Sequence, residues 1–392
     1  MNKVLSGDLI PAVVLDLGYG GYGVVRSLVE YGIPVIGFCN HRKLPEYRTK
    51  LCNRKVYFNG DADLREKLAD VASGLPHKPV LYLTADSYVK FAIENRQFID
   101  EHFLIHLPSN DVLNLLLDKT AFSDYALRHD ILIPRTHNLF NSEDLDSIAR
   151  TLEFPVILKP FVRTAAWRQA NLCKAYYLKS TDELRKIYAR VNKAESRLMV
   201  QEWIPGGDSN IHYCLVYFNG ESDCLASFTG YKIRQWPVGT GTASSTAPLE
   251  NKFVTESTIA LLKQIGYSGF GSVEYKHHGL NGHHYLIEPT VGRVEQIGYV
   301  ATANGVNLPL HCYNALTGSA MEEAPPPAMS VYFIDELADF ASAMVHFRKK
   351  RLRFGDYLRS LMRKNKFRYY NKHDLRVFFG LFRKALSFNF RK

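Results

Sequence analysis

The stretch from residue 11 to residue 38 constrains the fold more than any other part of the chain. It holds an apolar run at residues 11–17, a glycine-rich turn at 18–23, a helical pattern ending near Gly32, and a second apolar run at 34–38. A strand, a turn, a helix and a strand in this order form a βαβ unit, whose crossover makes the two strands parallel. The sequence therefore predicts an α/β fold built on a parallel sheet.

A second unit of this kind follows, with a strand at residues 79–83 and a helix at 88–96. We expect residues 1–110 to form one α/β domain. Parallel sheets bind ligands beyond the carboxyl ends of their strands, so the turns after the first and last of these strands supply the candidate substrate-binding residues. These residues are Gly20, Gly21, Asp86 and Ser87.

Each of these turns has another interpretation. Asp86 or Ser87 caps the following helix on the simplest reading. The glycine turn is either structural, or binds a carboxylate, or binds a dinucleotide. The last alternative is disfavoured because residues 39–41, Cys-Asn-His, lack the acidic group that would hold a ribose.

Three later apolar runs each end in charged or polar groups. Residues 156–160 read Val-Ile-Leu-Lys-Pro, residues 198–206 contain Gln201 and Glu202 before a Pro-Gly turn, and residues 285–293 contain Glu288 and Arg293. The pattern over residues 111–129 predicts one amphipathic helix, which contains an Asp-Lys pair at 118–119. An extended link containing Pro134 follows it. The order of these segments resembles that of the ATP-grasp superfamily, whose members activate a carboxylate as an acyl phosphate.

The resemblance implies a nucleotide site. Lys119 and Lys159 would bind phosphates, which suits an ammonium at the end of a rigid strand. Gln201 would face the adenine amino group, Glu202 and Ile204 would offer main-chain contacts, and Asp208 would hold the ribose. A basic strand near residues 229–236 is expected to carry Lys232 and Arg234 on one face. Lys232 would then be a third phosphate contact, and Arg234 would meet the γ-phosphate or the acyl phosphate as a catalytic group. Residues 161–168 depart from the family, because arginines and a tryptophan stand where many members have a loop rich in glycine and serine.

A predicted hairpin over residues 269–288, with a turn at 279–282, brings Glu274 and Glu288 side by side. Paired carboxylates need a positive group between them, and Mg²⁺ shared with triphosphate oxygens meets this need. The resemblance implies that both glutamates and Thr290, which replaces the usual asparagine, bind the metal, and that Arg293 is catalytic. Zinc binding by the histidines that flank the hairpin is the alternative, but cysteine partners are missing.

The positive charge of the chain is concentrated at its C-terminal end. The net charge is +10, and residues 341–392 contain 16 Lys/Arg against two Asp, a net of 16 − 2 = +14, so the remainder carries 10 − 14 = −4. A basic amphipathic helical extension after a proline-rich linker fits a surface that contacts anionic membrane, or a packed extension with a solvated basic face. Residues 1–8 lack the apolar segment of a secretory leader, no membrane span is read, and the six scattered cysteines fit reduced thiols.

We therefore expect a pre-ATP-grasp, Rossmann-like domain at residues 1–110, a bilobal ATP-grasp domain at 111–320 with its small lobe at about 121–205, and a linker and basic extension at 321–392. The expected activity is an ADP-forming carboxylate-amine ligase that uses ATP and Mg²⁺ and forms an amide bond. Its partners would be a small carboxylate and an amine rather than nucleic acid, with a homodimer as one assembly. The expected location is the cytoplasm, or the inner face of the membrane. The alternatives are an ATP-binding protein without ligase activity and a membrane-surface protein that acts through its extension.

Overall fold

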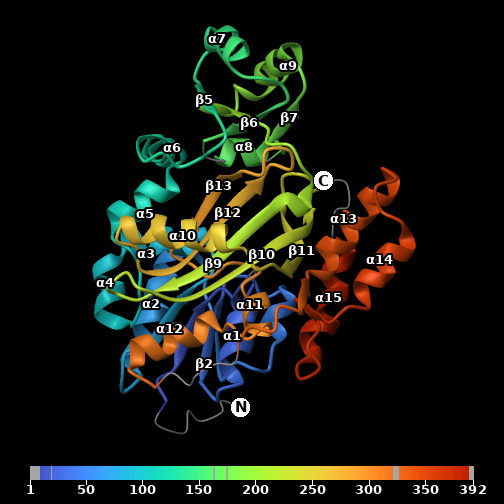
Figure 1. Ribbon diagram of the computed structural model, residues 1–392. Helices are drawn as coiled ribbons and strands as arrows, with labels where there is room; N and C mark the ends of the chain where they lie inside the picture. The colour runs from blue at the N-terminus through green and yellow to red at the C-terminus, as the bar shows by residue number, and fades with distance from the viewer. Residues whose placement is uncertain (1–8, 19, 162–163, 174, 321–325, 388–392) are drawn as a thin grey trace.

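A computed structural model shows the chain arranged around one large sheet (Figure 1). It describes residues 9–18, 20–161, 164–173, 175–320 and 326–387, with the side chains of 383–387 left out. The N-terminal part lies below the large sheet in Figure 1, a small lobe projects above it, and the C-terminal part runs along one side. The predicted α/β class is confirmed.

The N-terminal part is a four-stranded parallel sheet in the order β3-β2-β1-β4. Its strands are β1 (Ala12–Leu15), β2 (Val35–Cys39), β3 (Arg54–Tyr57) and β4 (Val80–Leu83). Its helices are α1 (Gly21–Val29), the 3₁₀ turn η1 (Pro45–Arg48), α2 (Gly60–Ser73), α3 (Asp86–Glu94) and α4 (Arg96–His102). Every residue of β1, β2 and β4 is buried, as a parallel sheet covered on both faces requires. The turn after β1 requires glycine at position 21, because a Cβ there would overlap the Asp16 carbonyl.

The helix predicted over residues 111–129 is in fact two helices, α5 (Asn110–Leu117) and α6 (Lys119–Arg128). Asp118 breaks the pattern because its backbone is extended and its Oδ1 accepts from the amides of Thr120 and Ala121 at 2.8 and 3.0 Å. The apolar periodicity continues across this N-cap, so it could not reveal the break.

The small lobe is an antiparallel sheet in the order β5-β8-β6-β7. Its strands are β5 (Thr136–Leu139), β6 (Val156–Pro160), β7 (Tyr176–Leu178) and β8 (Leu198–Glu202), and its helices are α7 (Asp144–Thr151), α8 (Ala165–Gln169) and α9 (Thr181–Val191). The lobe has its own hydrophobic core, which contains Leu158, Trp167 and Val200. Of the unusual 161–168 loop, residues 162 and 163 lie outside the described chain.

The large sheet has seven strands in the order β13-β12-β9-β10-β11-β14-β15. The strands are β9 (Ile211–Phe218), β10 (Cys224–Trp236), β11 (Thr242–Pro248), β12 (Gly269–His277), β13 (His284–Val291), β14 (Tyr332–Ile334) and β15 (Asn365–Phe367). The 3₁₀ turn η2 (Asp208–Asn210) precedes it, and α10 (Lys252–Gln264), α11 (Tyr299–Ala303) and α12 (Leu308–Thr317) pack around it. Strands β12 and β13 form the predicted hairpin, and Glu274 pairs with Glu288 in its register.

The C-terminal extension is more than a set of basic helices. It contains α13 (Glu336–Arg348), α14 (Phe354–Leu361) and α15 (Leu375–Ser387), but also β14 and β15, which extend the large sheet beyond β11. Arg368 is buried and pairs with Glu46 at 2.9 Å and with Asp335 at 2.7 Å. The extension is therefore tied to both the N-terminal part and the large sheet. The start of the predicted linker, residues 321–325, lies outside the described chain.

Among the described helices, none combines the length and the apolar character that crossing a bilayer requires.

Candidate nucleotide and substrate site

Two of the predicted nucleotide-binding residues meet on the small lobe. Lys159 and Gln201 come from the adjacent strands β6 and β8, and the Lys159 ammonium donates to Gln201 Oε1 at 2.9 Å. Gln201 Nε2 in turn donates to Thr136 Oγ1 at 2.8 Å. Both side chains are half-buried, and the chain of hydrogen bonds fixes the lysine at the end of its strand.

The segment after β8 connects the small lobe to the large sheet. Glu202 pairs with the backbone of Arg135, and Ile204 is buried. Lys276 of β12 donates from Nζ to the carbonyls of Gly206 and Gly207 at 2.9 and 2.6 Å. Burial lowers the pKa of Lys276 to about 8. Sequence reasoning missed this lysine, which anchors the connection between the two sheets.

Asp208 lies directly after this connection and is held by Gln235 of β10. Its Oδ2 accepts from the Gln235 amide and its Oδ1 from Gln235 Nε2, both at 3.0 Å. A carboxylate has about four lone-pair sites, so Asp208 retains acceptor capacity for the hydroxyls of a ligand. Gln235 was also missed, although it follows the two predicted cations on the same strand.

Lys232 of β10 makes a buried ion pair with Glu274 of β12. Its ammonium is 2.7 Å from the Glu274 carboxylate, and its side chain is 4% exposed against 24% for the glutamate. Strand β9 lies between β10 and β12, and the side chain of its Tyr213 passes over Gly230. The Tyr213 hydroxyl forms a hydrogen bond with Thr246 Oγ1. A Cβ at position 230 would clash with this hydroxyl, so only a glycine fits there. Two strands on either side of β9 thus bring a predicted phosphate-binding lysine to a predicted metal ligand.

The structure places Arg234 elsewhere. Its Nε and Nη2 atoms both donate to the Asp339 carboxylate of α13 at 2.8 Å, in a pair with 8% and 0% of the side chains exposed. The β10–β11 register is irregular between Lys232 and Gln235, so strict alternation does not hold there. Lys232 and Arg234 therefore do not converge on one ligand, contrary to the shared face expected from the sequence.

The carboxylates of the hairpin suit magnesium rather than an all-protein metal cage. Glu274 and Glu288 are cross-strand partners, and Thr290 is two residues further along β13, opposite Ser272. The described residues contain no cluster of three or more His, Cys, Asp or Glu side chains able to hold a metal. Mg²⁺ is usually held by one or two carboxylates together with substrate phosphates, so two glutamates and a hydroxyl fit it.

Two of the four predicted substrate residues, Asp86 and Gly20, lie against the Arg293 loop where the N-terminal part contacts the large sheet. Arg293 Nε donates to Asp86 Oδ1 at 2.5 Å, and Nη1 donates to Glu295 Oε2 at 3.1 Å. Burial would lower the pKa of Arg293, but Glu295, Asp86 and the nearby Glu288 outweigh it and raise that pKa. Gly20 packs on this loop, since a Cβ there would lie 3.0 Å from the Glu295 carbonyl.

Two details of this junction differ from the simplest sequence reading. Helix α3 begins at Asp86 and its N-cap is Ala85, without a side-chain cap, so the capping role for Asp86 or Ser87 is wrong. Ser87 is exposed on the first turn of α3. Glu295 was missed, although it stands only two residues beyond Arg293. Lys119, the remaining predicted phosphate ligand, is half-buried at the first position of α6.

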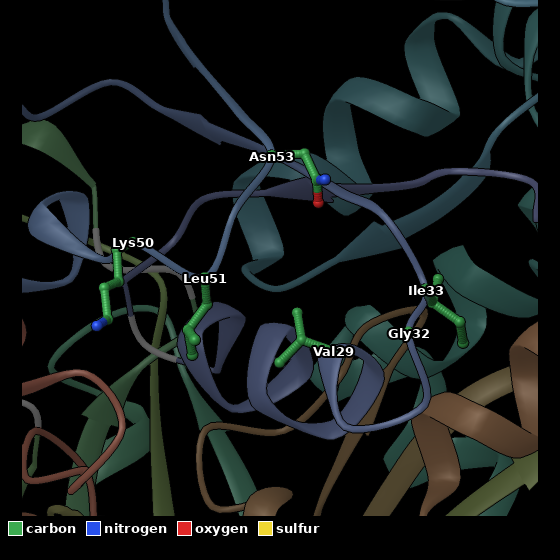
Figure 2. A pocket seen from close by; sticks show the side chains of 6 residues that line it. All are labelled: Val29, Gly32, Ile33, Lys50, Leu51 and Asn53. Atoms are coloured by element: carbon green, nitrogen blue, oxygen red, sulfur yellow. The ribbon is translucent and has the colours of Figure 1, made fainter. Parts of the chain in front are cut away.

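A pocket of about 390 Å³ lies away from all these groups. It is lined by Val29, Gly32, Ile33, Lys50, Leu51 and Asn53, and Figure 2 shows the Lys50 ammonium to one side, away from Asn53. These residues adjoin the amino ends of β2 and β3. Since α/β sheets bind ligands at the carboxyl ends of their strands, the junction around Arg293 is the better candidate.

No protein-family model matches the chain, but comparisons with known proteins find similar sequences and folds. A D-aspartate ligase from Enterococcus faecium (strain Aus0004) is 26% identical over 326 residues, which cover 79% of this chain and 76% of that protein. The biotin carboxylase domain of Hydrogenobacter thermophilus 2-oxoglutarate carboxylase matches with a TM-score of 0.61 and 16% identity, over 83% of this chain and 74% of that one. Staphylococcus aureus N5-carboxyaminoimidazole synthetase, complexed with ADP, matches with a TM-score of 0.62 and 14% identity, over 83% and 82%.

These similarities show the fold of the chain. The chain has the fold of these ATP-grasp enzymes.

Proposed function

We propose that this protein is an ADP-forming ligase that uses ATP and Mg²⁺ to join a carboxylate to an amine. The carboxylate oxygen attacks the γ-phosphorus, the bond to the β-phosphate oxygen breaks, and ADP leaves. The amine nitrogen then attacks the acyl carbon, phosphate leaves, and the nitrogen loses a proton to give the amide. The observation that carries the proposal is the placing of Lys159, Lys232 and the Glu274–Glu288 pair on two sheets joined by one short connection.

The proposed nucleotide site uses groups from both sheets. Lys159 and Lys232 neutralise the phosphates, with Lys119 as a third cation. Gln201 recognises the adenine amino group, the main chain of Glu202 and Ile204 contacts the base, and Asp208 accepts from the ribose. Positioned charges of this kind contribute most of the rate in phosphoryl transfer, because the protein itself takes little part in the bond changes.

Glu274, Glu288 and Thr290 are the proposed magnesium ligands. When bound, Mg²⁺ would supply positive charge that offsets the charge developing on the transferring phosphoryl group. The ion pair with Lys232 holds the Glu274 carboxylate in place. Thr290 contributes one hydroxyl where related sites have an amide.

The proposed substrate side is the junction formed by Gly20, Gly21, Asp86, Ser87 and Arg293. Arg293 supplies a fixed cation beside the carboxyl ends of β1 and β4, which suits a carboxylate substrate. Asp86 and Glu295 hold its guanidinium in place. The similarity to a D-aspartate ligase supports acidic amino acids as the first carboxylates to test. Of the two predicted catalytic arginines, Arg293 keeps this role in the proposal, while Arg234 is assigned to the packing of α13.

ADP release tests the proposal. Purified protein with MgATP, D-aspartate and a pool of amines should release ADP only when all components are present. Lys159→Ala and Glu288→Ala should each lower kcat/KM by about a hundredfold or more. Lys252→Ala and Glu256→Ala are matched controls, because that pair is exposed on α10, and both should keep full activity. MgATP binding without turnover on any carboxylate would favour the ATP-binding alternative.

An exposed stripe on α14 supports a second function, contact with anionic membrane. Phe354, Leu358 and Met362 follow one another at intervals of four residues and are 64%, 44% and 79% exposed. Exposed cations surround them: Arg348, Lys349, Lys350, Arg351, Arg353, Arg359, Arg363, Lys364 and Lys366. Each cation near an anionic surface contributes about 1 kcal/mol at most, and the apolar stripe adds insertion of side chains at the interface.

Vesicle sedimentation tests this second function. The protein should bind phosphatidylglycerol vesicles but not phosphatidylcholine vesicles, and less at high salt. The triple variant Phe354→Ala, Leu358→Ala, Met362→Ala should bind less, whereas Phe253→Ala, which removes an exposed aromatic ring on α10, should not. Equal binding to both kinds of vesicle, or to neither, would count against it. A cytoplasmic location and a homodimer complete the proposal, and light scattering measures the latter.

A further inference from the structure

His346 on helix α13 is half-buried next to Asp208, the residue proposed to bind the ribose, and its Nε2 atom is buried. Its Nε2 atom has no hydrogen-bond partner among the described residues and lies 3.9 Å from Asp208 Oδ2. This distance is too long for a hydrogen bond, and a shift of about 1 Å would make it one. A buried polar atom without a partner is costly in a folded protein and calls for a reason.

Helix α13 is fixed to the strand that holds Asp208. Asp339 of α13 makes the bidentate pair with Arg234, and Ser244 of β11 also donates to Asp339 at 3.3 Å. The next residue after Arg234 is Gln235, which makes both of its hydrogen bonds to Asp208. Strand β10 therefore contacts helix α13 through Arg234 and holds Asp208, the residue proposed to bind the ribose, through Gln235.

From this arrangement we infer that His346 positions Asp208 for the ribose, which makes the C-terminal extension a part of the nucleotide site. This inference rests on the proposed ATP-dependent function. Gln235 occupies one side of the Asp208 carboxylate, and His346 faces Oδ2 from the helix. When ribose hydroxyls donate to Asp208, His346 closes on Oδ2 and prevents the carboxylate from rotating away. His346 is a positioning residue, since it acts through Asp208 and not on the nucleotide itself.

The charges around His346 are consistent with a neutral donor. Burial lowers the pKa of His346, Asp208 raises it, and Arg234, Arg351 and Lys349 lower it further. A neutral imidazole with its proton on Nε2 donates to a carboxylate without requiring acid conditions. Its contribution should therefore change little between pH 7 and pH 8.

Nucleotide affinity in matched histidine variants tests the inference. Titration calorimetry of the full chain would measure Kd for MgATP and for its 2′-deoxy and 3′-deoxy analogues. His346→Ala should weaken ATP binding on the order of tenfold, as expected for one hydrogen bond to a charged group. It should also reduce the preference for ATP over at least one deoxy analogue. His346→Gln, whose amide can donate from a similar position, should restore most of the affinity. His311→Ala is the control, because His311 on α12 also has a buried ring nitrogen without a partner in the described chain.

A second arm tests the dependence on Asp208. In an Asp208→Asn background, His346→Ala should weaken ATP binding less than twofold further, because coupled residues do not act additively. The inference is overturned if His346→Ala and His346→Gln bind all three nucleotides as the wild type does. It is also overturned if His346→Ala weakens ATP and both deoxy analogues by the same factor. Wild-type protein that binds no MgATP would instead overturn the proposed function, and the inference with it.

Discussion

Replacing Arg234 with methionine should destabilise the protein without removing a phosphate contact. Asp339 is fully buried, and within the described part of the chain the substitution leaves its carboxylate with the 3.3 Å hydrogen bond from Ser244 alone. Breaking one side of a buried ion pair costs about 3–5 kcal/mol. At about 2–3 °C per kcal/mol for a large cooperative unit, the melting temperature should fall by roughly 6–15 °C.

The double variant Arg234→Met, Asp339→Leu separates the loss of the pair from the burial of an unpaired charge. Apolar replacement of both partners is often nearly neutral, so the double variant should regain most of the lost stability. The assay is thermal unfolding followed by circular dichroism, together with the rate of ADP formation at a temperature where all variants are folded. The reasoning would be refuted by a single variant that melts within about 1 °C of the wild type and yet loses ADP formation a hundredfold. Arg234 would then act on the phosphates, as the sequence resemblance implied.

Three further outcomes follow from buried contacts. Burial, His284 and His277 lower the pKa of His212 from 6.5 to about 4. Between these two pH values His212 is therefore protonated in the unfolded chain but neutral in the folded chain. Stability in urea should therefore fall as the pH drops from 6.5 toward 4, and less so in His212→Asn. Lys276→Met removes the two hydrogen bonds that the Lys276 ammonium donates to the carbonyls of residues 206 and 207. Amide hydrogen exchange of residues 203–208 should then become faster, while exchange in β9 stays unchanged. Gly230→Ala puts a Cβ 2.6 Å from the Ala247 carbonyl, and should lower the free energy of unfolding by about 1–3 kcal/mol in the same urea assay.

The sequence was sufficient wherever a local pattern determines the structure. Alternating residues and a Gly-Leu-Asn-Gly turn predicted the hairpin, and the register that pairs Glu274 with Glu288 follows from it. The apolar run, glycine turn and helix at residues 11–38 likewise predicted the parallel sheet. In both cases the partner strands are close in sequence, or the crossover rule supplies the pairing.

The sequence was insufficient where the partner is distant in the chain. Lys232 and Arg234 look alike on a strand pattern, and only the fold shows that one meets Glu274 and the other Asp339, which is 105 residues away. The strands β14 and β15 have three residues each, too few for a clear alternation of apolar and polar residues. Strand β14 forms by pairing with β11, and β15 pairs with β14. Gln235, Glu295 and His346 carry no motif and were found only through their contacts.

The pairing of β14 with β11 has a consequence for how the protein is made. Ser245 and Thr246 of β11 pair with Ile334 and Phe333, which leave the ribosome after β11 does. Until then the large sheet presents β11 as an uncovered edge, which can pair with the same edge of another nascent chain. Expression fragments that stop before residue 330 would keep this edge open permanently. Recombinant fragments of the catalytic domain should therefore extend through β15, and shorter ones should collect in inclusion bodies.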